Sequence, residues 1–112
     1  MALVNSSRNT VLAENVTIAS SLFSRMQGLL GRETFARNEA LILMPCNAIH
    51  TFFMRFAIDC LFVDKNNRIV KLIPRLLPWR ISRPYLKSRF VIELPAGTIA
   101  ATGTLQGDVI SF

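Results

Sequence analysis

The chain has 112 residues, 51% of them hydrophobic, and a formal net charge of +6. This length is in the ordinary range for one domain and allows a packed core without disulfide or metal staples. The composition excludes an intrinsically disordered chain, which would have few apolar and many charged residues. Only two cysteines are present, Cys46 and Cys60, so the sequence gives no reason to expect a disulfide framework.

The first residues contain no basic region followed by an apolar stretch, which argues against a secretory signal and predicts a cytoplasmic location. We interpret residues 1–9 as a flexible tail of a single domain that covers residues 1–112. Residues 11–19 are rich in β-branched side chains and are interrupted at Glu14 and Asn15. This pattern predicts two short strands or one bulged strand.

Residues 22–30 form the one helix that the sequence predicts. Ser20 or Ser21 can cap its start, and Gly31 suits a left-handed C-cap. The apolar side chains recur at helical spacing and are Leu22, Phe23, Met26, Leu29 and Leu30. We expect this helix to pack on the rest of the domain.

Strands are predicted through the middle of the chain. The apolar run at residues 40–44 ends at a proline and predicts a buried strand. Residues 50–56 and 58–63 are both strand-like. Residues 64–68 suit a tight turn because asparagine tolerates positive φ, and the chain then returns over residues 68–73 as a hairpin partner.

Three prolines interrupt the stretch that follows, Pro74, Pro78 and Pro84. Because proline cannot donate to a ladder, this stretch is predicted to be a long basic loop. Residues 89–94 and 105–112 are predicted strands, whereas residues 98–103 are ambiguous.

Many short strands, frequent turns and one early helix predict a mainly β (α+β) fold. We expect a small antiparallel β-sandwich or partly open barrel with one N-terminal helix packed on it. A parallel α/β fold is disfavoured because the crossover helices are missing.

The most hydrophobic window, residues 45–63, is long enough to raise the question of a membrane span. Its interior contains His50, Arg55 and Asp59. Ionisable groups are costly at that depth of a bilayer, so no membrane span is predicted.

Cys46, His50 and Asp59 bring a thiol, an imidazole and a carboxylate into one short segment. Cys46 and His50 are possible zinc ligands, but a second close ligand pair is missing. Alternatively, His50 could activate the Cys46 thiol while Asp59 orients the imidazole. We prefer a structural interpretation, in which Cys46 is a small buried residue and His50 satisfies backbone groups. No catalytic residue, metal or cofactor is therefore predicted.

Arg55 and Asp59 both interrupt a strongly apolar segment, and burying either charge unpaired would be costly. We expect them to lie together, either as an ion pair that fixes a bend near Ala57-Ile58 or as part of a binding site. The predicted ligand-binding residues are Thr51, Phe53, Arg55 and Asp59. In such a site Arg55 would hold a carboxylate or phosphate.

Residues 65–92 contain eight basic residues and no acidic one, which favours anionic partners. Aromatic residues lie among these cations, as in surfaces that bind single-stranded nucleic acid or anionic sugars. The candidate residues are Arg75, Trp79, Arg80, Arg83 and Tyr85. No nucleic-acid motif accompanies them, and we prefer the interpretation that Trp79 and Leu76-Leu77 anchor the loop while the arginines stay solvated.

Several motifs occur in the order found in one known family. They are Gly28-Leu29-Leu30-Gly31-Arg32, the segment from Ile49 to Asp59, Leu61-Phe62-Val63-Asp64, the segment from Val91 to Gly97, and Gly107-Asp108. Over residues 20–112 the chain resembles the family called domain of unknown function 192. The resemblance implies a compact β-rich, sandwich-type domain, and it implies no established activity, cofactor or catalytic residue.

The leading functional hypothesis is a non-catalytic binding module for an anionic small molecule, a sugar or a protein partner. One alternative is a hydrolase or metal-dependent enzyme built on Cys46, His50 and Asp59. A second alternative is single-stranded nucleic-acid binding through residues 65–92.

Overall fold

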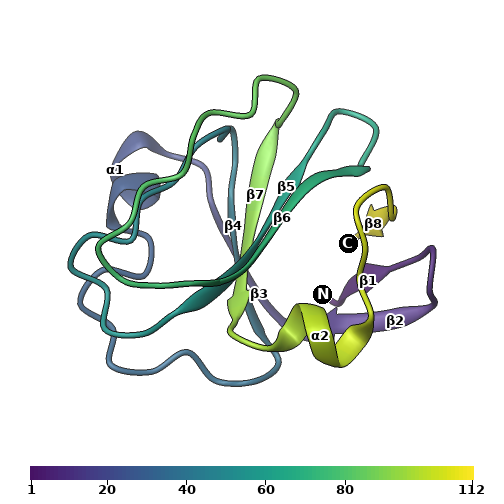
Figure 1. The fold of residues 1–112 in the computed structure, drawn as a ribbon, viewed down its shortest axis with the longest axis horizontal. Coiled ribbons are helices and arrows are strands. Elements are labelled where there is room, and N and C mark those ends of the chain that lie inside the picture. Colours follow the sequence, from purple (N-terminus) through teal and green to yellow (C-terminus); the bar gives the residue numbers. More distant parts are fainter.

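The computed structural model describes residues 1–112 as two β-sheets with two short helices (Figure 1). The elements are β1 (Leu3–Asn5), β2 (Thr10–Ala13), β3 (Asn15–Ala19), α1 (Leu22–Gln27), β4 (Glu39–Leu43), β5 (Ile58–Val63), β6 (Ile69–Leu76), β7 (Phe90–Pro95), α2 (Thr98–Thr102) and β8 (Ile110–Ser111). The smaller sheet has the strand order β2-β1-β8, and the larger has β3-β4-β7-β5-β6. All neighbours are antiparallel except β3 and β4, which pair in parallel. The mainly β class is confirmed, and the sheets do not close into a barrel.

The larger sheet is covered on both faces, because alternate residues of a strand point to opposite sides. On one face, Ile42 and Ile92 pack against the smaller sheet and α2. On the other face, Phe62 and Val91 pack beneath the loops that follow β4 and β6. Glu93 follows Ile92 on β7 and therefore points to the same face as Val91.

The elements with strong local signals are confirmed. Strand β4 is buried, and β5 and β6 form the predicted hairpin. In its turn, an Asp64 carboxylate oxygen accepts hydrogen bonds from the amides of Asn66 and Arg68, and Asn67 has a φ of 60°. Glu14 separates β2 from β3, and these two strands lie in different sheets.

Helix α1 differs from its prediction in length and in packing. Ser21 caps it as expected, but the helix ends at Gln27 with Gly28 at the C-cap instead of Gly31. None of its own residues is buried. Leu29, just beyond the cap, enters the core instead, so the predicted helical segment packs on the domain mainly through the turn that follows α1. Neither helix is long and apolar enough to cross a membrane.

Two other predictions need correction. Residues 50–56 form a loop instead of a strand, joined to the 77–81 segment by a bridge between His50 and Ile81. Pro74 lies within β6, an edge strand, where its pairing with β5 is irregular, and proline is tolerated at such positions. The ambiguous stretch after β7 is helix α2.

Residues 1–9 are not a free tail in this structure. Strand β1 lies between β2 and β8, with Leu3 and Asn5 fully buried. The tail prediction failed because the partners of β1 include β8, more than 100 residues away in sequence.

Candidate functional site

A pocket of about 180 Å³ lies between α1 and the larger sheet. Its walls come from α1 with the turn that follows it, and from the loop after β4. Its remaining boundary includes Leu43 of β4 and Glu93 of β7. The lining is mostly apolar, and its polar members are Arg25, Gln27, Cys46, His50 and Glu93.

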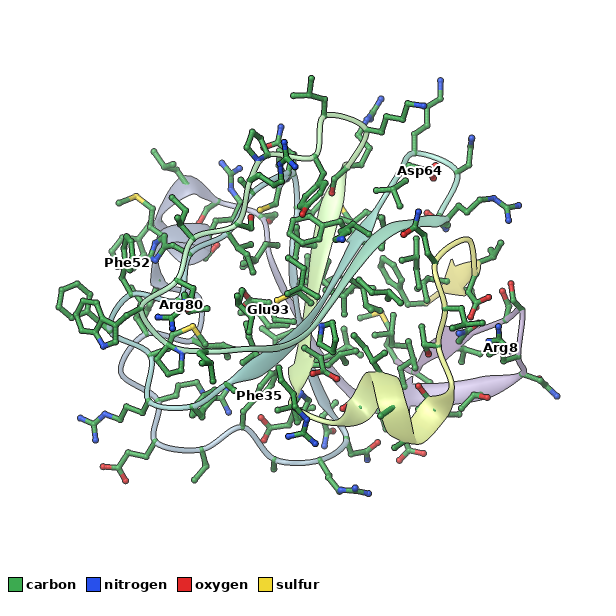
Figure 2. All side chains as sticks on the ribbon, in the orientation of Figure 1. Arg8, Phe35, Phe52, Asp64, Arg80 and Glu93 are labelled. Atoms are coloured by element: carbon green, nitrogen blue, oxygen red, sulfur yellow. The ribbon has the colours of Figure 1, made fainter.

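Glu93 is the most buried of the polar residues that line this pocket. Glu93 is only 3% exposed. It pairs with Leu41 of β4 on one side and with Cys60 of β5 on the other. Figure 2 shows it in the middle of the fold. No hydrogen bond or salt bridge from the protein is made to its carboxyl group, and none of its unpaired oxygens is fully enclosed, because Glu93 lines the pocket.

Burial raises the pKa of Glu93 to about 8. The carboxyl group is therefore mostly protonated at neutral pH, with one O–H donor and acceptor capacity to spare. A buried polar group without a partner destabilises a fold, and an apolar residue would suit this position better. The structural environment thus gives no stabilising role to this side chain.

Cys46 and His50 meet in this pocket, as their spacing suggested, but they do not form a catalytic pair. The Cys46 thiol donates a hydrogen bond to the carbonyl of Ala48 at 3.1 Å. Burial, reinforced by the nearby Glu93 carboxylate, raises the pKa of this thiol. His50 Nδ1 accepts a hydrogen bond from the amide of Phe52 at 3.2 Å, which leaves Nε2 as the free ring nitrogen. No hydrogen bond joins the thiol to the imidazole, so the geometry disfavours a thiolate nucleophile.

Arg25 brings an unpaired positive charge to the pocket wall. Its Nη1 donates to the carbonyl of Pro45 at 2.8 Å and its Nε to that of Ser21 at 3.3 Å. These bonds fix the guanidinium between α1 and the loop after β4. No carboxylate forms a salt bridge with it, so its remaining N–H groups can reach a ligand.

Asp59 lies outside this pocket. It is fully buried, and its carboxylate accepts hydrogen bonds from the amides of Arg75 at 2.9 Å and Ile99 at 2.8 Å. Arg55 is exposed and forms its salt bridge with Glu33 at 3.4 Å. The expected pairing of Arg55 with Asp59 is therefore not formed, because backbone amides satisfy the buried carboxylate.

The four predicted ligand-binding residues do not line a common cavity. Thr51 is buried, and its hydroxyl donates to the carbonyl of Leu77 at 2.6 Å and accepts from the amide of Arg80 at 2.9 Å. Phe53 is exposed, whereas Asp59 is wholly internal. Ligand binding by these residues stays a prediction.

The basic loop is anchored differently from the prediction. Of the three predicted anchors, Leu76 packs against the core, whereas Trp79 and Leu77 are both more than half exposed and do not anchor the loop. Tyr85 is half-buried and packs on Phe62 with ring centroids 4.6 Å apart. The remaining candidate residues of the loop are exposed, namely Arg75, Arg80 and Arg83.

Sequence reasoning missed Glu93. A signal was present, because one charged residue interrupts the apolar segment 90–94, as Arg55 and Asp59 interrupt theirs. The metal hypothesis finds no further ligands, since no group of three or more His, Cys, Asp or Glu side chains is arranged to hold an ion.

The model of the DUF192 family, described as uncharacterized ACR, matches residues 3–112. The chain belongs to the DUF192 family. Among its relatives, UPF0127 protein PH1112 of Pyrococcus horikoshii is 34% identical, over 98% of this chain and 97% of that protein. A UPF0127 protein of Thermococcus sibiricus is 33% identical, over 98% of this chain and 73% of that protein.

Two solved structures of bacterial proteins share the DUF192 fold seen here. One is a protein of unknown function from Novosphingobium aromaticivorans, with a TM-score of 0.83 and 18% identity over 99% of this chain and 82% of that one. The other is a candidate transcription regulator from Sinorhizobium meliloti, with a TM-score of 0.81 and 22% identity over 98% of this chain and 89% of that one. The family model and the archaeal relatives show the family, and the two solved structures show the fold alone, so the role of the pocket is inferred from its geometry.

Proposed function

We propose that this DUF192 protein is a binding module that takes a small organic carboxylate into the pocket beside α1. The observation that carries the proposal is the buried carboxyl group of Glu93, which faces the pocket with no partner from the protein. A side chain that weakens the fold and is aimed into a cavity fits a role in ligand recognition.

The polar groups of the pocket favour an anion. Arg25 supplies a positive charge that no protein carboxylate neutralises, and His50 offers its free Nε2. Glu93 is protonated at neutral pH, so it can donate a hydrogen bond to a carboxylate oxygen without repelling it.

The size and lining of the pocket favour a compact ligand with an apolar body. At about 180 Å³ the cavity is smaller than the roughly 300 Å³ at which drug-sized ligand pockets begin. Apolar side chains such as Leu43, Ile49 and Met54 form much of its wall.

The proposed location is the cytoplasm, with which two free cysteines are compatible.

Calorimetric titration with a panel of short-chain carboxylates at pH 6.5 tests the proposal. We expect binding by the wild type and a loss of about tenfold or more in Arg25→Gln, which removes the ion pair. Wild-type affinity should fall as the pH rises through about 8, because Glu93 then becomes charged and repels the ligand. Glu93→Gln should keep binding without this pH dependence, since the amide still donates a hydrogen bond.

The matched control is Glu33→Gln, an exposed glutamate outside the pocket. It should bind like the wild type at every pH. The proposal is wrong if no carboxylate binds, if Arg25→Gln binds as tightly as the wild type, or if Glu93→Gln keeps the wild-type pH dependence.

A further inference from the structure

Apolar side chains gather on two loops at one end of the protein. Phe52 and Phe53 pack around Trp79, with ring centroids 6.0 and 4.6 Å from that of the tryptophan. Phe53, Trp79 and the nearby Ile81 are 68%, 55% and 71% exposed. We name Phe52, Phe53, Trp79 and Ile81 the aromatic tip. Figure 2 shows Phe52 toward one end of the long axis of the protein. So many large apolar groups in one exposed place mark an interaction surface.

Hydrogen bonds from one buried residue hold the aromatic tip in place. The amide of Thr51 donates to the carbonyl of Arg80 at 2.8 Å, and the amide of Trp79 donates to the carbonyl of Thr51 at 3.0 Å. The Thr51 hydroxyl adds its bonds to Leu77 and Arg80. The two loops are thus tied together at their base.

Two residues of the aromatic tip have a strained backbone conformation. Phe53 and Trp79 have φ values of 66° and 63°, in the left-handed region that residues with bulky side chains rarely adopt. The hydrogen bonds of Thr51 maintain that conformation while the rings stay in solvent. Strain held in place by surrounding structure is typical of functional segments.

The apolar surface continues from the aromatic tip to α1. His50 stacks on Phe52 with ring centroids 5.1 Å apart, and it lines the same pocket as Leu22 and Met26 of α1. Both α1 residues are largely exposed. The same end of the protein therefore presents aromatic and aliphatic side chains together.

The charge around the aromatic tip is positive. Arg80 lies between Trp79 and Ile81 in sequence, and Arg83 follows shortly after; both are exposed. Residues 40–58 and 65–92, which include both loops, contain no aspartate or glutamate. An anionic partner is therefore electrostatically matched to this surface.

We propose that the aromatic tip docks the protein onto anionic lipid bilayers. Aromatic and aliphatic side chains on protruding loops would enter the boundary between headgroups and acyl chains, while Arg80 and Arg83 face lipid phosphates. A peptide partner is a poorer match, because no cavity is lined by Phe53, Trp79 or Ile81. Single-stranded nucleic acid needs free ring faces, whereas these rings pack on one another beside aliphatic groups.

Trp79 is the sole tryptophan, so its fluorescence reports on the aromatic tip directly. The probes are vesicles of phosphatidylcholine alone and of phosphatidylcholine mixed with phosphatidylglycerol. With the anionic vesicles we expect co-sedimentation, a blue shift of Trp79 emission and quenching by brominated acyl chains. Salt should weaken this binding, because it screens the attraction between the arginines and the lipids.

Two sets of variants separate the apolar from the electrostatic contribution. Phe53→Ser and Ile81→Ser should each lower partitioning by about tenfold, as expected for an apolar side chain that leaves water. Arg80→Gln and Arg83→Gln should each lower it by about fivefold. These side chains are exposed, so the variants should keep the wild-type melting temperature, which is measured alongside.

Leu105→Ser and Arg37→Gln are the matched controls. Leu105 is 54% exposed, like the residues of the aromatic tip, but it lies between α2 and β8. Both controls should partition like the wild type. The proposal is overturned if anionic vesicles leave Trp79 emission unchanged, if Phe53→Ser partitions like the wild type, or if single-stranded oligonucleotides and not vesicles quench Trp79.

Discussion

Glu93 opposes the stability of its own fold over a defined pH range. In the unfolded chain a glutamate titrates near about 4.3, whereas in the folded protein burial raises the pKa of Glu93 to about 8. Between these values the folded state binds the proton more tightly, so the free energy of unfolding decreases as the pH rises. The decrease begins near the lower value and ends as the pH passes the higher one.

Glu93→Gln should remove this dependence. We expect wild-type stability to fall by several kcal/mol between about pH 4.5 and pH 8, whereas the variant changes much less, because it has no proton to lose. At pH 9 the variant should therefore be the more stable protein. Urea denaturation of both proteins at pH 5, 7 and 9 measures this, with Glu33→Gln as the exposed control. Parallel stability curves for wild type and Glu93→Gln would contradict the assignment.

Asp59 of β5 joins an edge strand of the larger sheet to helix α2. One carboxylate oxygen accepts from the amide of Arg75 in β6, and the other accepts from the amide of Ile99 in α2. Gly97 before α2 offers no side-chain cap, so Asp59 supplies an acceptor that the helix lacks locally. Asp59 is thus a structural link between β5, β6 and α2.

Asp59→Asn should loosen this link. The asparagine side chain has one acceptor oxygen and one NH₂ donor, so the N–H group of either Arg75 or Ile99 would face a donor. We expect the free energy of unfolding to fall by about 1–3 kcal/mol. Hydrogen exchange should show reduced protection at the amides of Arg75 and Ile99, whereas the amides of the β4–β7 pairing keep theirs. Unchanged stability and unchanged protection at both amides would show that these bonds do not hold the elements together.

The sequence predicted the elements whose determinants are local. Strand β4 and the β5–β6 hairpin depend on a continuous apolar run and on turn residues such as Asn67. The loop at residues 50–56 could not be recognised, because Thr51 bonds to Arg80 across 29 positions. Helix α1 was overextended because Gly28 and Gly31 are both suitable C-caps, and tertiary packing decides between them.

The sequence indicated only those residues of the candidate site that are close together in the chain. Cys46 and His50 lie four residues apart and line the same pocket, so their sequence spacing marked them as candidates. Their neighbour Glu93 comes from β7, and only the pairing of β7 with β4 and β5 brings it there. Asp59 is close to Cys46 and His50 in sequence but points away from the pocket. Its neighbour Cys60 points to the pocket face of the larger sheet, and successive residues of a strand point to opposite faces.

The two ends of the chain are joined through Asp108. Its Oδ2 atom accepts hydrogen bonds from Asn5 Nδ2 at 2.9 Å, Arg8 Nε at 2.7 Å and the amide of Leu105 at 2.9 Å. Desolvation raises the pKa of this carboxyl group, but the bonds from Asn5, Leu105 and Arg8 outweigh it, and the pKa is lowered overall. The smaller sheet therefore depends on a charged Asp108.

Asp108→Asn should destabilise the protein at neutral pH and much less in acid. A lowered pKa means that the contribution of Asp108 is present above about pH 4, where an unfolded aspartate is ionised, and is lost as the pH falls through the folded value. We expect a loss of about 1–3 kcal/mol at pH 7, because the oxygen that accepts from the three donors then carries no negative charge. Urea denaturation at pH 7 and pH 2.5 measures both values, with Glu14→Gln as an exposed control. An equal loss at the two pH values would mean that the geometry of the side chain, and not its charge, joins β1 to the carboxyl-terminal segment.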